Sequence, residues 1–122
     1  MKIYHPSNKL FNIVKTKYFG ENFYTLRDLK ASKLPRTFWY LKERIPEQRF
    51  KNSKFLYQAE ILRNSLYDLR TDNYNLITKT KNIDNLLRKI KRDYQGVIYN
   101  VGQYNIIALF NDIKAIRKRK VI

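Results

Sequence analysis

The sequence predicts a mainly α-helical fold with a small β component. Apolar residues recur at helical spacing in most segments, Pro and Gly punctuate those segments, and strand-like alternation is concentrated near the carboxyl end. The chain has 122 residues, enough for one hydrophobic core but not for two independent ones. We therefore expect a first part, residues 1–70, and a second part, residues 71–122, which packs on the first or mediates self-association.

The first expected element is a helix over residues 7–19. Ser7 can cap its start, Gly20 can end it, and apolar side chains recur at helical spacing between them. These apolar residues are Leu10, Phe11, Val14 and Tyr18. The alternation around Ile13 and Lys15 leaves a strand open as the alternative.

Two short helices are expected next, over residues 26–31 and 35–44. Thr25 can satisfy free amides in the first turn of the earlier helix. Pro35 suits the first position of the later helix, where a missing N–H costs nothing, and Pro46 must lie at or beyond its end. The residues between the two helices are too few for anything but a turn.

The helix over residues 35–44 has two distinct faces at a step of 100° per residue. The inward face carries Phe38, Leu41 and Ile45, and the outward face carries Arg36, Trp39, Tyr40, Glu43 and Arg44. Exposed arginines and aromatic rings on a short helix are what major-groove readout of DNA needs. The alternative is that Trp39 and Tyr40 complete the core against another helix.

The segment after Pro46 alternates basic and apolar residues around the polar pair Asn52-Ser53. This pattern predicts a short hairpin, or wing, that lies on a phosphate backbone. Its basic residues are Arg49, Lys51 and Lys54. The alternative is the start of a helix, and both hold if the wing ends near Tyr57 and an amphipathic helix covers residues 58–70.

Residues 24–62 also contain an ordered set of residues typical of one kind of DNA-binding unit. The set is Tyr24, Thr25, Leu26, Asp28, Leu29, Arg36, Thr37, Phe38, Tyr40 and Glu43 in the helices, with Pro46, Arg49, Asn52 and Tyr57 in the wing. It resembles the winged helix-turn-helix of the MerR and excisionase-like DNA-binding families. In this chain the turn before Pro35 is one residue shorter than the usual form, and Ser53 stands where the wing usually has Gly.

The resemblance implies that the helix over residues 35–44 enters the major groove while the wing holds the flanking backbone. The expected nucleic-acid-binding residues of this unit are Arg36, Thr37, Trp39, Tyr40, Arg44, Arg49, Lys51, Asn52 and Lys54. Nothing downstream resembles the long dimerisation helix or the Cys-containing sensor loop of the regulator proteins. A minimal DNA-binding member is therefore favoured over a metal or redox sensor.

A further amphipathic helix is expected over residues 82–94. Its apolar residues at helical spacing are Ile83, Leu86, Leu87, Ile90 and Tyr94, and its basic residues are Arg88, Lys89, Lys91 and Arg92. The favoured interpretation is a core helix with a solvated basic face. Phosphate binding by that face is a secondary hypothesis.

The carboxyl end combines a hairpin with a basic tail. Val97, Tyr99 and Val101 alternate before Gly102-Gln103, which predicts a β-hairpin whose edge could support self-association. The tail residues expected to grip phosphate non-specifically are Arg117, Lys118, Arg119 and Lys120.

Charge and composition indicate the class of partner. Lys and Arg number 26 against 10 Asp and Glu, so the net charge is +16 and a polyanion such as nucleic acid is expected. No apolar run of about 18 residues and no secretory h-region occur, so no membrane partner is expected. We expect a cytoplasmic or nucleoid location, with an organellar matrix as the alternative.

The residue types give little support for catalysis. The chain has no cysteine and one histidine, His5, so no metal site is expected. Its three glycines form no phosphate-binding loop and its acidic residues are scattered. We therefore expect no cofactor and no enzymatic activity.

The function expected from the sequence is double-stranded DNA binding. The chain would serve as a repressor, an excision or recombination accessory factor, or a packaging factor of a mobile element or virus, as a homo-oligomer or in assembly with other nucleoprotein components. The main alternative is a structural RNA-binding protein of a ribosome, which the small size and positive charge fit equally well. An mRNA-cleaving toxin is the weakest alternative, because no acid–base constellation is present.

Overall fold

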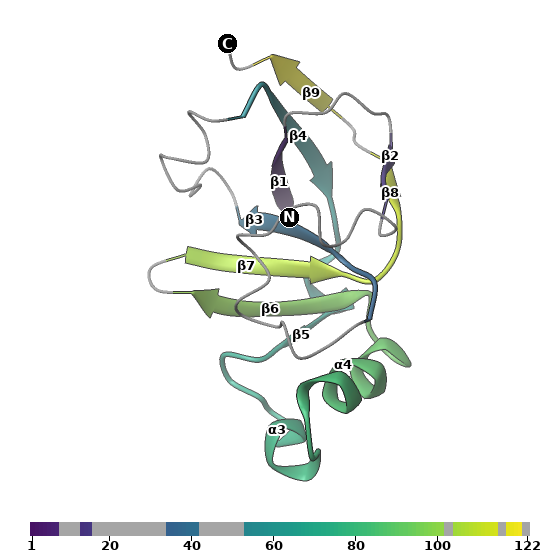
Figure 1. The fold of residues 1–122 in the computed structure, drawn as a ribbon. Helices are drawn as coiled ribbons and strands as arrows, with labels where there is room; N and C mark the ends of the chain where they lie inside the picture. The colour runs from purple at the N-terminus through teal and green to yellow at the C-terminus, as the bar shows by residue number, and fades with distance from the viewer. Residues whose placement is uncertain (8–12, 16–33, 42–52, 102–103, 115–116, 121–122) are drawn as a thin grey trace.

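The computed structural model describes residues 1–7, 13–15, 34–41, 53–101, 104–114 and 117–120, and within them the fold is mainly β (Figure 1). Seven strands form one sheet in the order β5-β6-β7-β3-β1-β4-β9. A second, two-stranded sheet consists of β2 (Ile13–Val14) and β8 (Ile113–Lys114). The prediction of a mainly α-helical winged helix-turn-helix fold is therefore wrong.

Strands from both ends of the chain are interleaved in the large sheet. They are β1 (Lys2–Ser7), β3 (Thr37–Leu41), β4 (Phe55–Glu60), β5 (Leu66–Asp68), β6 (Gly96–Val101), β7 (Tyr104–Leu109) and β9 (Arg117–Lys120). All neighbouring strands run antiparallel except β5 and β6, which are parallel. The described helical elements are the 3-10 turn η3 (Arg63–Ser65) and the helices α3 (Leu76–Lys79) and α4 (Ile83–Lys91).

One face of the sheet forms a hydrophobic core with α4. The helix contributes Leu86, Leu87 and Ile90, and the sheet contributes Phe38, Tyr40, Tyr67, Val97, Tyr99, Ile106 and Ala108. The side chain of Asn82 caps the helix, because it accepts a hydrogen bond from the backbone N–H of Asn85 at 2.8 Å. This packing fixes which side of α4 faces solvent.

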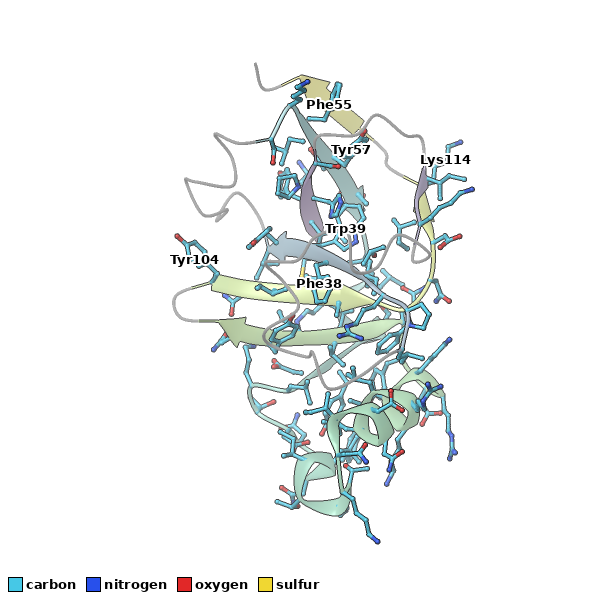
Figure 2. All side chains as sticks on the ribbon, viewed as in Figure 1. Phe38, Trp39, Phe55, Tyr57, Tyr104 and Lys114 are labelled. Atoms are coloured by element: carbon cyan, nitrogen blue, oxygen red, sulfur yellow. The ribbon has the colours of Figure 1, made fainter. Side chains whose placement is uncertain are left out.

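The opposite face carries a second core. A row of side chains runs across four neighbouring pairs of strands, from β4 through β1, β3 and β7 to β6, and consists of Tyr57, His5, Trp39, Ile107 and Ile98. Each of the five is at most 5% exposed. The central strand β3 is consequently covered on both faces (Figure 2).

The expected helix over residues 35–44 is replaced by β3. Thr37 is β-branched and the next three residues are aromatic, a composition that favours strands. Because β3 is buried on both faces, its residues form a continuous apolar run without the alternation that marks a half-buried strand. Such a short run cannot be distinguished from a helical segment by periodicity alone.

Three other predicted elements are also different in the structure. The segment expected as a helix over residues 58–70 contains the end of β4, η3 and β5. Within residues 7–19, Ser7 ends β1 and Ile13–Val14 forms β2, so the strand alternative holds there. The basic tail is not an appendage, because Arg117–Lys120 forms the edge strand β9.

Two predicted elements are confirmed. The helix α4 lies within the predicted range, and its four basic residues, Arg88, Lys89, Lys91 and Arg92, are exposed. The strands β6 and β7 pair antiparallel as the predicted hairpin. The hairpin lies inside the sheet between β5 and β3, and in the described sheet β5 pairs with residues 96–98 of β6. The predicted helix over residues 26–31, and the residues Arg44, Arg49, Lys51 and Asn52, lie outside the described residues.

Candidate nucleic-acid interface

The residues expected to read the major groove are in the interior. Arg36 is 1% exposed, Trp39 is 0% exposed, and Thr37 and Tyr40 are also buried. They lie on or next to β3, between β1 and β7. The structure therefore does not bring these four side chains together on an outer surface.

Arg36 is held by the fold around it. Its Nη1 donates to the Leu34 carbonyl at 2.7 Å, and its guanidinium carbon lies 5.4 Å from the centre of the Phe38 ring. Burial lowers the pKa of Arg36, while Tyr99 and Asp84 act in the opposite direction. A guanidinium this deeply buried makes its hydrogen bond and its ring contact within the interior and is not placed to contact a phosphate in solvent.

His5 fills a gap in the hydrogen-bonded ladder between β1 and β3. The ladder pairs Ile3 with Leu41 and Tyr4 with Tyr40, a register that would place Pro6 opposite Phe38. Proline has no N–H to donate at that position. The His5 Nδ1 lies 2.6 Å from the Phe38 carbonyl, which therefore accepts from the ring nitrogen, and the neutral imidazole must carry its proton on Nδ1. His5 thus has a structural role at this point of the sheet.

Basic residues are concentrated in two regions of the described chain. The first is α4 with the segment before it, where residues 76–93 contain six basic and two acidic residues. Arg88, Lys89 and Arg92 fall within about 100° of one another around the helix axis, opposite the buried Leu86 and Ile90. We call the exposed residues Arg88, Lys89, Lys91 and Arg92 the α4 basic face.

The Arg88 charge on that face is partly offset. Its Nε donates to the Asp84 carboxylate at 2.7 Å, one helical turn earlier. Basic residues in a last turn also interact favourably with the helix dipole, which gives the α4 basic face a structural role of its own. The Arg88–Asp84 ion pair reduces the positive charge that the α4 basic face offers to a ligand.

The second region is the edge strand β9. Arg117, Lys118, Arg119 and Lys120 occupy four successive positions, and β9 pairs only with β4 in the described sheet. The register places Lys120 opposite Phe55, and Phe55 follows the exposed Lys54 in the sequence. We call Lys54 together with Arg117–Lys120 the β9 basic edge. Figure 1 shows β9 and α4 at opposite ends of the molecule.

Two further arginines of the described chain share one carboxylate near the end of β5. The Asp68 carboxylate accepts from Arg70 Nη2 at 2.7 Å and from Arg63 Nη2 at 2.8 Å. Hydrogen bonding to Arg70, followed by the attraction of both arginines, lowers the pKa of Asp68 to about 2. These two cations therefore add less to the field around the protein than the α4 basic face or the β9 basic edge.

The sequence pattern singled out part of this interface. The helical period predicts the α4 basic face on the solvent side. As a phosphate-binding site, however, this face is only a secondary hypothesis from the sequence, which favours the segment over residues 35–44. The run of four basic residues at positions 117–120 is evident in the sequence. Its place in the sheet is not, because the pairing with β4 joins segments about sixty residues apart.

The described residues contain no group of three His, Cys, Asp or Glu side chains arranged to hold a metal ion. The helices among them are too short and too polar to cross a bilayer. Comparisons of the chain with protein-family models, with curated proteins and with solved structures return no match. Any function must therefore be argued from the charge and geometry above.

Proposed function

We propose that this chain binds nucleic acid through the phosphate backbone. The observation that carries the proposal is the α4 basic face, a set of four exposed cations on a helix whose other side is locked into the core. The helix is anchored by buried leucine and isoleucine side chains, so its cations are presented in a fixed orientation. Fixed cations lose less freedom on binding than cations of a disordered segment.

The β9 basic edge supports the same proposal from the other end of the molecule. A sheet edge carries unpaired backbone groups, and Lys-rich edges resist pairing with a second copy because like charges would meet. Four cations in succession repel another β9 strand and attract a polyanion. A polyanion that reaches both regions must be long, which favours nucleic acid over a small anion.

Backbone binding of this kind does not require a base-reading helix. Phosphate contacts supply affinity and position but carry no sequence information. The proposal therefore differs from major-groove recognition by residues 35–44, because Arg36, Thr37, Trp39 and Tyr40 are buried in and next to β3. Duplex DNA is the first ligand to test, and structured RNA is the second, because both present closely spaced phosphates.

The test is fluorescence anisotropy with a labelled DNA duplex over a series of salt concentrations. The logarithm of the binding constant should fall linearly with the logarithm of salt, with a slope of about −0.9 per phosphate contacted. The double variant Lys89→Gln/Arg92→Gln should bind more weakly and flatten the slope by about 1.8 if both side chains contact phosphates. The double variant Lys118→Gln/Lys120→Gln tests the β9 basic edge in the same way.

The matched control is Lys2→Gln, which removes one exposed charge from β1, outside both basic regions. It should reduce the slope by less than either double variant. Unchanged slopes in both double variants would contradict the proposal. Tight binding to structured RNA with no binding to the DNA duplex at about 150 mM salt would keep the backbone mechanism but assign it to RNA.

A further inference from the structure

Tyr74 is an aromatic side chain on the surface, where large rings are uncommon. It is 62% exposed, and the other exposed large hydrophobic residues of the described chain, Ile13, Leu62 and Ile77, are aliphatic. Tyr74 lies in the turn between β5 and α3. Single exposed apolar residues are ordinary on a protein surface, so the significance of Tyr74 depends on what holds its ring and which charges lie on the same segment.

The fold holds Tyr74 in place from one side. Its ring is stacked on that of Tyr67, with centroids 6.3 Å apart and planes inclined by 21°. The backbone N–H of Tyr74 donates to the Tyr67 hydroxyl at 3.2 Å. The two near-parallel rings are offset at this separation and Tyr74 is mostly exposed, so much of its ring surface is open to solvent.

The supporting ring is itself fixed. Tyr67 is 3% exposed, its edge-on contact with Tyr94 spans 5.4 Å between centroids, and its hydroxyl donates to the Asp72 carboxylate. Burial, followed by the hydrogen bond to Asp72, raises the pKa of Tyr67, so the hydroxyl stays protonated at neutral pH. The Tyr74 platform is therefore preorganised and loses little freedom when a ligand stacks on it.

The turn also holds the Asp72 carboxylate in place next to the Tyr67 hydroxyl. The Asp72 carboxylate accepts from the backbone N–H of Leu76 at 2.9 Å and of Ile77 at 3.1 Å. Asp72 adopts a left-handed backbone conformation, with φ of 47°. Its carboxylate serves the first turn of α3 and the Tyr67 hydroxyl, so its charge is engaged within the protein.

Cations lie on the same segment. Lys79 in the last turn of α3 is exposed and acts electrostatically on Asp72, and Lys81 follows two residues later, also exposed. An exposed ring on the same short segment as two exposed ammonium groups offers chemistry for the two parts of a nucleotide, a flat base and a phosphate. Single-strand-binding surfaces combine stacking rings with cations in this manner.

We propose that Tyr74 stacks on an unpaired base of single-stranded nucleic acid while Lys79 and Lys81 hold adjacent phosphates. The inference rests on the proposed backbone binding and adds the class of nucleic acid that this surface accepts. Bases within a duplex are already stacked on one another, so their faces are closed to the Tyr74 ring. Every base has a π face, so the contact favours single strands over duplexes without selecting a sequence.

The test compares a fluorescent oligothymidylate with a duplex of equal length at about 150 mM salt. Tyr74→Ala should weaken binding to the single strand by about 5- to 150-fold, the range for loss of one stacked base, and leave duplex binding unchanged. Tyr74→Phe keeps the ring and should bind the single strand as the wild type does. Leu62→Ala, at a 74% exposed aliphatic residue, is the matched control and should have no effect.

Thermal unfolding of each variant separates recognition from folding, because a structural role of Tyr74 would lower the melting temperature and weaken both ligands together. Equal single-strand affinity in Tyr74→Ala and the wild type would overturn the inference while duplex binding still supported the proposed function. Failure of the wild type to bind either ligand would overturn both. A loss in Tyr74→Ala that Tyr74→Phe does not restore would also count against stacking.

Discussion

Replacement of Trp39 by alanine should destabilise the fold strongly. Trp39 has no exposed surface, its Nε1 donates to the Thr37 hydroxyl at 2.9 Å, and its ring centroid lies 5.3 Å from that of His5. Removal of a buried tryptophan side chain costs about 3–5 kcal/mol. A domain of this size unfolds with about 5–15 kcal/mol, so the substitution removes a large share of the stability.

Urea denaturation followed by far-ultraviolet circular dichroism measures this loss directly. Trp39→Phe keeps an aromatic ring in the core but loses the hydrogen bond to Thr37, so its free energy of unfolding should lie between those of the wild type and Trp39→Ala. Leu62→Ala is the surface control and should stay within about 0.5 kcal/mol of the wild type.

A loss below about 1 kcal/mol for Trp39→Ala would refute the placement of Trp39 in a central strand buried on both faces. The wild-type chain gives an independent readout, because Trp39 is its one tryptophan. Its fluorescence emission should be blue-shifted and weakly quenched by acrylamide. A red-shifted, readily quenched emission would indicate instead an exposed ring, as on an outward helical face.

Three further substitutions test other parts of the fold. His5→Phe leaves the Phe38 carbonyl without its ring-nitrogen donor and should cost about 1–3 kcal/mol in urea denaturation, and an unchanged midpoint would contradict the ladder repair by His5. Gly96→Ala should cost about 1–3 kcal/mol, because its Cβ would lie 2.2 Å from the Ala108 carbonyl oxygen, and retention of the wild-type melting temperature would argue against that close approach. Asp68→Asn should lower stability at neutral pH by on the order of 1 kcal/mol, since its arginine partners are partly exposed. The folded pKa of Asp68 is depressed to about 2 from 3.8, so its contribution is present above about pH 4 and is lost as the pH falls through about 2, and denaturation curves of wild type and Asp68→Asn should converge over that interval.

Elements with local and one-sided patterns were predictable from the sequence. In α4 the apolar residues recur every three to four positions because a single face is buried, and Asn82 caps the helix from just before its start. In the β6–β7 hairpin the two strands are adjacent in the sequence, so alternation and a short connection were enough. Both features depend on residues that are close together along the chain.

The central strands were not predictable in the same way. Leu56 and Tyr57 of β4 are both buried although successive strand residues point to opposite faces, so the strand lacks alternation. The residues of β4 and after it also include Leu, Ala and Gln, which favour helices, and their spacing fits a helical period. Pairing of β4 with β1 and β9, at opposite ends of the chain, overrides this local preference.

The same cause explains why Arg36 and Trp39, which were expected at the interface, are buried. Whether an arginine or a tryptophan serves as a ligand donor or as part of the core depends on which strands cover it, and β3, which carries Trp39 and directly follows Arg36, lies between β1 and β7. The cations of α4 are exposed because the local pattern of that helix buries its other side. Net charge predicted a polyanionic partner independently of the fold, and the fold then restricts the side chains that can meet it. The proposed binding to the phosphate backbone is compatible with burial of these side chains, whereas readout of base edges would require particular side chains together on one exposed recognition element.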